Sequence, residues 1–252
     1  SHYSPYKVAE NFRMLESMFP GRIDLGIGRA PGSDQPTSQA LAYGGGIGVE
    51  NFPTMISDLS GFLTDSLPED HPFSRVKARP FTNNAPPVWL LGSSNYSAAY
   101  AAHFGLAFSF AHFITPFGGE AVIRAYQDQF QAAGTLDNPK CNIGIFVICA
   151  ETQEEADKLI TSRDLFRLRA DKGDLAPVPS IEEAIAYPYT DAEREHVLQS
   201  RTRTIYGSPE KVKEKILALG ELFQCDEFLV LTACHEFQDR VRSYELLAEV
   251  FS

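Results

Sequence analysis

A glycine-rich segment near the amino terminus is the first candidate for chemistry. Residues 21–32 read GRIDLGIGRAPG, an apolar run followed by glycines that surround one cation, Arg29. A dinucleotide-binding fingerprint needs the spacing G-x-G-x-x-G and opens directly into a helix, so that the pyrophosphate meets the helix amino terminus. Here the spacing is G-x-G-x-x-x-G, and Pro31 and Pro36 oppose a helix start. The segment therefore predicts a strand with Arg29 at its carboxyl end, and not a dinucleotide site.

A serine-rich loop is the second candidate. In LLGSSNYS, residues 90–97, Ser93 and Ser94 follow a predicted strand, and Ser97 lies in the first turn of the predicted helix. Hydroxyl groups and the free N–H groups of a helix start suit a phosphate. The alternative is an ordinary serine cap of the helix without any ligand.

Two histidines end predicted strands. His112 closes the apolar run 106–113, where a lone histidine is commonly a core residue, and contact with a ligand is the alternative. His235 and Glu236 follow the last predicted strand, but glutamate is common at a helix start. A metal would need His112, His235 and Glu236 to converge, so we predict no metal site.

The elements that must position these residues alternate along the chain. Apolar runs typical of buried strands are separated by helical segments, of which 4–19 and 208–223 begin with Ser-Pro. This order predicts an α/β fold with a parallel sheet. The expected strands are 22–28, 88–92, 106–113, 142–150 and 226–233, with a long loop over 31–53 and a helical excursion within 171–190.

Two architectures fit this order. An open, doubly wound sheet agrees with five strands, whereas about 250 residues is a typical length for a (β/α)8 barrel. The chain has 252 residues and begins with a helix, so the second architecture would have lost its first three strands.

Composition excludes several classes. The formal net charge of −11 argues against a nucleic-acid-binding protein. Apolar runs such as NIGIFVICA are shorter than the ~20 residues of a membrane-spanning helix, and no signal peptide is expected. The cysteines lack a C-x-x-C spacing and are typical of small buried residues in a reducing compartment, so we predict a cytoplasmic protein. They are Cys141, Cys149, Cys225 and Cys234.

Four segments, in order, resemble the bacterial luciferase-like family of flavin-dependent monooxygenases. They are HYSPYKVAENFRMLESMFPGRIDLGIGRAPGSDQ, VWLLGSSNYSAAYAAHFGLAFSFAHF, GSPEKVKEKI and RSYELLAEVF. The resemblance covers the chain from residue 2 to its end and implies a single domain over 1–252. The family fold is a (β/α)8 TIM barrel, of which this chain is expected to supply about five parallel strands, corresponding to strands four to eight.

The resemblance also implies a chemistry. Members use reduced FMN and dioxygen to oxidise a small organic substrate, which here is unidentified. Arg29 matches a position that reaches the flavin, although it could instead pair with Asp34. Ser94 and Ser97 match the hydroxyl positions of the FMN phosphate loop, and some members carry a carboxylate where Ser93 stands. His112 matches a position beside the flavin ring and is the candidate catalytic residue.

Partners and alternatives follow from the same resemblance. We expect a flavin reductase to supply reduced FMN, and a homodimer. An active-site histidine that the family carries at the end of its second strand has no counterpart here, which leaves the activity of this chain open. The alternatives are a deazaflavin-dependent oxidoreductase and a non-catalytic protein that self-associates through exposed sheet edges.

Overall fold

The computed structural model describes residues 3–30, 35–42, 51–133, 136–174 and 176–252. The chain divides into two compact units, which are described separately. Unit 1 comprises Ser1–Phe110 and Ala121–Cys141, and unit 2 comprises Ala111–Glu120 and Asn142–Ser252. The expectation of a single domain over 1–252 stays a prediction.

Unit 1 is built on three parallel strands. They are β1 (Leu25–Gly28), β2 (Val88–Gly92) and β3 (Ala107–Ala111). In the register, Gly28 pairs with Leu91, and Gly92 pairs with Phe110. Every residue of β3 is buried, as expected for a parallel strand that is covered on both faces.

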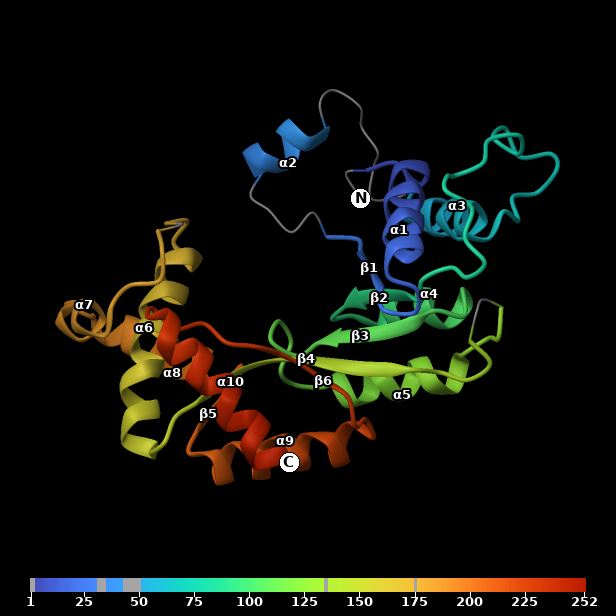
Figure 1. The fold of residues 1–252 in the computed structure, drawn as a ribbon. Helices are drawn as coiled ribbons and strands as arrows, with labels where there is room; N and C mark the ends of the chain where they lie inside the picture. Colours follow the sequence, from blue (N-terminus) through green and yellow to red (C-terminus); the bar gives the residue numbers. More distant parts are fainter. Residues whose placement is uncertain (1–2, 31–34, 43–50, 134–135, 175) are drawn as a thin grey trace. The chain divides into compact units, whose positions relative to one another are not determined.

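Helices accompany these strands, and the second helix of the chain lies away from them (Figure 1). They are α1 (Pro5–Met18), α2 (Gln35–Ala42), α3 (Phe52–Thr64), α4 (Asn95–His103) and α5 (Gly119–Gln129), the last of which begins in unit 2. Helix α1 starts as predicted, because the Ser4 hydroxyl accepts a hydrogen bond from the Lys7 N–H. Its buried residues are Ala9, Arg13 and Glu16, while Phe19, which follows the helix, is exposed.

Unit 2 has its own parallel strands, of which β4 is the centre. They are β4 (Cys141–Cys149), β5 (Thr204–Gly207) and β6 (Phe228–Leu231). Ile143 pairs with Phe228 of β6, and Phe146 pairs with Thr204 of β5. The helices are α6 (Gln153–Asp171), α7 (Ile181–Ala186), α8 (Asp191–Arg201), α9 (Pro209–Phe223) and α10 (Phe237–Phe251).

The predicted α/β order with parallel strands is confirmed, with additions. All five expected strands are present, as β1, β2, β3, β4 and β6, and β5 is a further short strand. The loop predicted over 31–53 is wrong in part, because α2 lies within it; residues 31–34 and 43–50 lie outside the described residues. The excursion predicted within 171–190 contains α7, as expected.

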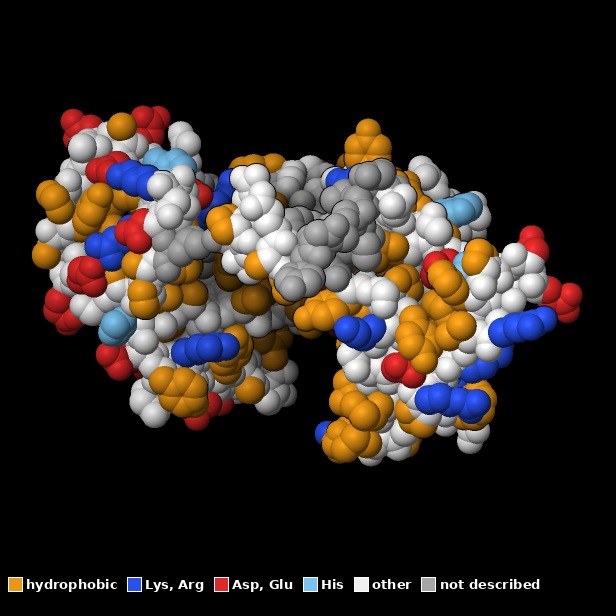
Figure 2. Space-filling view, turned by 90° about the horizontal axis from the view of Figure 1, so that it is seen from above, with side chains coloured by type: hydrophobic (Ala, Val, Ile, Leu, Met, Phe, Trp, Pro, Cys, Tyr) orange, Lys and Arg blue, Asp and Glu red, His pale blue; other side chains and the backbone are white. Residues whose placement is uncertain are grey.

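The surface mixes side chains of all types. In the space-filling view, acidic and basic side chains alternate with exposed apolar ones (Figure 2). Within the described residues, no helix combines the length and the apolar character needed to cross a bilayer.

Candidate flavin site

The serine loop lies in unit 1, between the carboxyl end of β2 and the start of α4. Ser94 is the N-cap residue of α4, with extended backbone angles. The Ser94 N–H donates to Ser97 Oγ at 3.3 Å, and the Ser97 hydroxyl donates to the Ser94 carbonyl at 2.8 Å. The two hydroxyl oxygens are 3.2 Å apart. The loop therefore gathers two hydroxyl groups at the amino-terminal turn of a helix, where backbone N–H groups lack helical partners.

Gly92 makes this compact turn possible. A Cβ atom added to Gly92 would lie 2.2 Å from Ser97 Oγ and 2.4 Å from Ser97 Cβ. Such distances leave no space for any side chain at residue 92. Ser97 thus occupies the place that a side chain at the end of β2 would fill, and its hydroxyl is held close to the strand end.

Arg29 is brought to the same sheet edge. It directly follows β1, whose last residue pairs with Leu91 of β2, so the carboxyl ends of the two parallel strands are neighbours. The Arg29 guanidinium carbon lies 6.0 Å from the centroid of the Tyr96 ring, and the Tyr96 side chain is 70% exposed. The structure therefore places a cation over the first turn of α4. Asp34, the alternative partner of Arg29, lies outside the described residues.

His112 belongs to unit 2 and directly follows β3. It is 6% exposed, and its Nδ1 atom is buried without a hydrogen-bond partner among the described residues. Its ring lies 5.9 Å from that of Phe223. Burial lowers the pKa of His112 below its ordinary value, because the charged imidazolium is poorly solvated there. A neutral imidazole with a vacant nitrogen can accept a proton or a hydrogen bond.

His235 does not join His112 in the described contacts. Its Nδ1 atom lies 2.7 Å from the Val178 carbonyl, and its Nε2 atom lies 3.5 Å from Glu236. Among the described residues, no group of three or more histidine, cysteine, aspartate or glutamate side chains is arranged to hold a metal ion.

Comparison with known proteins identifies the family. The family model described as luciferase-like monooxygenase matches residues 1–223. The chain belongs to the luciferase-like monooxygenase family.

Relatives in this family match nearly the whole chain. The Uncharacterized protein YceB of Bacillus subtilis (strain 168) is 45% identical over 249 residues, which cover 99% of this chain and 75% of the relative. The N-acetyl-S-alkylcysteine monooxygenase of the same organism is 34% identical over 249 residues, which cover 98% of this chain and 74% of the relative. The crystal structure of apo-MsnO8 has a TM-score of 0.88 and 33% identity, covering 99% of this chain and 74% of that one. The family fold inferred from the sequence is thereby confirmed.

The structure brings two further residues, Tyr96 and Gly92, to the serine loop and Arg29. Tyr96 gave no signal of its own in the sequence, because its position under Arg29 depends on the pairing of β1 with β2. Gly92 was treated only as the end of a strand. Its role depends on the distance to Ser97, which the order of residues does not reveal.

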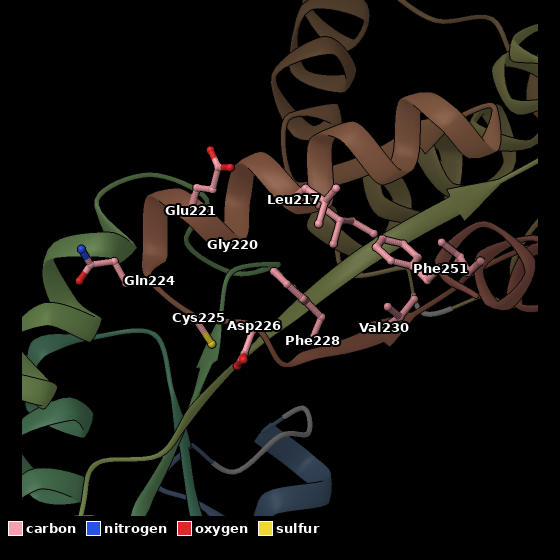
Figure 3. Close-up of a pocket in the computed structure, with 11 residues that line it drawn as sticks. Leu217, Gly220, Glu221, Gln224, Cys225, Asp226, Phe228, Val230 and Phe251 are labelled. Carbon is pink, nitrogen blue, oxygen red and sulfur yellow. The ribbon is translucent and has the colours of Figure 1, made fainter.

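Unit 2 also contains an apolar cavity of about 800 Å³ between α9, α10 and β6. Figure 3 shows Leu217 on α9, Phe251 on α10 and Val230 on β6 around it. Phe237 and Phe251 are both exposed, and Leu246 and Leu247 are the buried apolar residues of α10. Polar side chains, Glu221, Gln224 and Asp226, line the cavity as well.

Proposed function

We propose that this protein is a flavin-dependent monooxygenase that uses reduced FMN and dioxygen to oxidise a small organic substrate. The observation that carries this proposal is the meeting of Arg29 with the Ser94–Ser97 loop at the carboxyl ends of β1 and β2. Barrel enzymes carry their chemistry at this end of the strands. Membership of the luciferase-like family supports the reaction class.

The residues present fit FMN. Ser94 and the N–H groups of the amino-terminal turn of α4 would donate to the phosphate, with Ser93 beside them. The Ser97 hydroxyl would join them by turning its proton from the Ser94 carbonyl to the phosphate. Arg29 would contact the flavin carbonyl edge or the phosphate, and it remains charged at any working pH. When bound, the flavin supplies the redox chemistry, and the protein supplies position and a dry environment.

His112 is the proposed catalytic residue. Because its ring is buried and its Nδ1 atom has no partner among the described residues, it can accept a proton or a hydrogen bond from a substrate or from the flavin. The lowered pKa keeps the imidazole neutral near neutral pH, which is the form that accepts a proton.

Partners and location complete the proposal. A flavin reductase would deliver reduced FMN, the chain would form a homodimer, and the protein would act in the cytoplasm. The four cysteines lack a C-x-x-C spacing, which is typical of small buried residues in a reducing compartment.

Flavin titration tests the site. FMN and riboflavin, which lacks the phosphate, would be titrated into the wild type and into Ser97→Ala, Arg29→Ala and Ser66→Ala. We expect Ser97→Ala to weaken FMN binding about tenfold, as for a lost hydrogen bond to a charged group, with little effect on riboflavin. Ser66→Ala removes an exposed hydroxyl elsewhere in unit 1 and should change neither. Saturable FMN binding that is unaffected by Arg29→Ala and Ser97→Ala would contradict the site.

Three further measurements distinguish the monooxygenase from the two alternative functions. Oxygen consumption with FMN, a flavin reductase and NADH tests the monooxygenase reaction. Tight binding of a deazaflavin, without FMN binding, would favour the deazaflavin-dependent oxidoreductase. A folded, self-associated protein that binds neither cofactor would favour the non-catalytic alternative.

A further inference from the structure

A second pocket lies in unit 2, around the carboxyl end of α8. It has a volume of about 570 Å³, within the range of small-molecule sites. Its lining combines Arg167, Arg203 and His196 with the hydroxyl residues Ser200 and Thr202. Pro116 and Phe117, which follow β3 by a few residues, form an apolar wall, and the Phe117 side chain is 73% exposed.

The lining has one acidic side chain, which is already paired. Asp171 lies 2.6 Å from the Arg167 guanidinium and 2.9 Å from His196 Nε2. Among the described residues, the Arg203 guanidinium has no ion pair or hydrogen bond to another side chain. An unpaired arginine is notable in a chain with a net charge of −11, where acidic partners are plentiful.

Further positive charge lies behind the pocket. Arg163 is 5% exposed and donates from Nη1 to Ser200 Oγ at 3.1 Å. Asp164 pairs with two arginines: its Oδ1 atom lies 3.6 Å from Arg163 Nη1, and its Oδ2 atom lies 2.6 Å from Arg201 Nε. Arg167 and Arg203 in the lining and Arg163 and Arg201 beyond it thus accompany two carboxylates, Asp171 and Asp164, so this cluster has an excess of two positive charges. The Ser200 hydroxyl, which already accepts from Arg163, keeps its own proton to donate to a ligand.

We propose that this pocket binds a small organic acid, with its carboxylate on Arg203 and Ser200 and its apolar body against Phe117 and Pro116. An arginine fork matches a carboxylate with two parallel hydrogen bonds, and the excess charge of the cluster favours an anion over a neutral ligand. The apolar wall selects an acid with a hydrophobic body over a bare inorganic ion. The proposal does not depend on flavin, because carboxylate binding can be measured without it.

Calorimetric titration of the full chain, without flavin, tests this inference. The probes are benzoate, its neutral analogue benzamide, acetate and inorganic phosphate. We expect saturable binding of benzoate, about tenfold weaker binding by Arg203→Ala, and an intermediate loss for Arg203→Lys, which keeps the charge but not the fork. Arg194→Ala is the matched control, because Arg194 lies on α8, near Arg203 in the chain, but does not line the pocket. This variant should bind benzoate as the wild type does.

Phe117→Ala isolates the apolar wall. Its side chain is mostly exposed, so the variant should fold, and it should weaken benzoate binding several-fold while leaving acetate unchanged. If Arg203→Ala does not fold, the Phe117→Ala variant still tests the inference. Equal binding of benzamide and benzoate, binding of phosphate without benzoate, or unchanged benzoate binding in both Arg203→Lys and Phe117→Ala would overturn the proposal.

Discussion

Arg13 and His112 are both buried, and they avoid an unpaired buried charge in opposite ways. Arg13 is 1% exposed but donates from Nη1 to the Phe62 carbonyl at 3.0 Å and from Nη2 to Asp65 at 2.8 Å. His112 is nearly as buried, yet burial shifts its pKa downwards and the ring stays neutral. A guanidinium cannot lose its proton at working pH and must be paired, whereas an imidazole can simply remain uncharged.

His112→Gln should reduce the sensitivity of the fold to acid. The pKa of His112 is lower in the folded chain than its ordinary value of about 6.5, so below that pH the unfolded chain binds the proton more readily. The free energy of unfolding therefore decreases as the pH falls from about 7.5 to about 5, because protonation of His112 favours the unfolded chain. Urea unfolding at both pH values should show that the free energy of unfolding decreases less for the variant than for the wild type. His103→Gln, at an exposed position of α4, should behave as the wild type; equal losses in all three proteins would contradict the prediction.

Arg13→Ala should destabilise unit 1 by about 3 kcal/mol, at the low end for a broken buried ion pair because Asp65 is partly exposed. The variant leaves the Phe62 carbonyl without its donor and Asp65 without its cation. Arg13→Met should recover part of the loss, since an apolar side chain of similar length refills the space. Arg22→Ala, at an exposed site, should change the free energy of unfolding by less than about 0.5 kcal/mol. Urea unfolding checks the series, and equal effects of Arg13→Ala and Arg22→Ala would rule out the pairing as a stabilising contact.

At the scale of elements, the junction between β2 and α4 has little freedom. Only Ser93 and Ser94 separate Gly92 from the first helical residue, so the strand end and the first turn are nearly in contact. This closeness places the Ser94 and Ser97 hydroxyls at the sheet edge. The proposed phosphate site therefore depends on backbone spacing as much as on the serines themselves.

Gly92→Ala should disrupt this junction. Its Cβ would overlap Ser97, so the helix start must shift, at a cost of about 1–3 kcal/mol and with loss of FMN binding. Gly28→Ala is the matched control at the end of the neighbouring strand, where the nearest atom to an added Cβ is the Leu91 carbonyl oxygen at an ordinary 3.7 Å. Thermal unfolding and flavin fluorescence measure both effects. A Gly92→Ala protein that binds FMN as the wild type does would show that the loop is not the phosphate site.

At the scale of the whole molecule, exposed apolar strand residues favour self-association. On β6, Leu229 is 48% exposed and Leu231 is 41% exposed, and among the described strands β6 pairs with β4 only. Strand edges with exposed apolar side chains pair readily with further strands. This observation supports the predicted homodimer.

Leu229→Lys combined with Leu231→Lys should therefore shift the protein towards monomer. Sedimentation velocity over a range of concentrations would report the change. Leu198→Lys, at an exposed leucine of α8, is the control for an added charge and should leave the distribution unchanged. A wild type that is monomeric at all concentrations would exclude the homodimer, and a dimer that persists in the double variant would place its interface elsewhere.

Much of the fold could be predicted because its signals are local. Apolar runs marked five strands, and the Ser-Pro pairs at Ser4 and Ser208 marked helix starts to within a residue. Strand β5 was missed because TIYG is too short to show a periodicity, and α2 because proline and glycine around it indicated a loop. Helix α8, whose Thr190 cap pairs reciprocally with Glu193, carried a capping signal that sequence reasoning did not use.

The sequence by itself determined the alternation of helices with five of the strands, the family, and the candidate residues Arg29, Ser93, Ser94, Ser97 and His112. Only the tertiary structure decided that Arg29 and the serine loop share one edge, because that depends on the register between strands more than 60 residues apart in the chain. It also decided which polar side chains are buried, as with Arg13 and Glu16 on α1. Propensity and periodicity act over a few residues, whereas burial, clearance and charge pairing depend on segments that meet only when the chain packs.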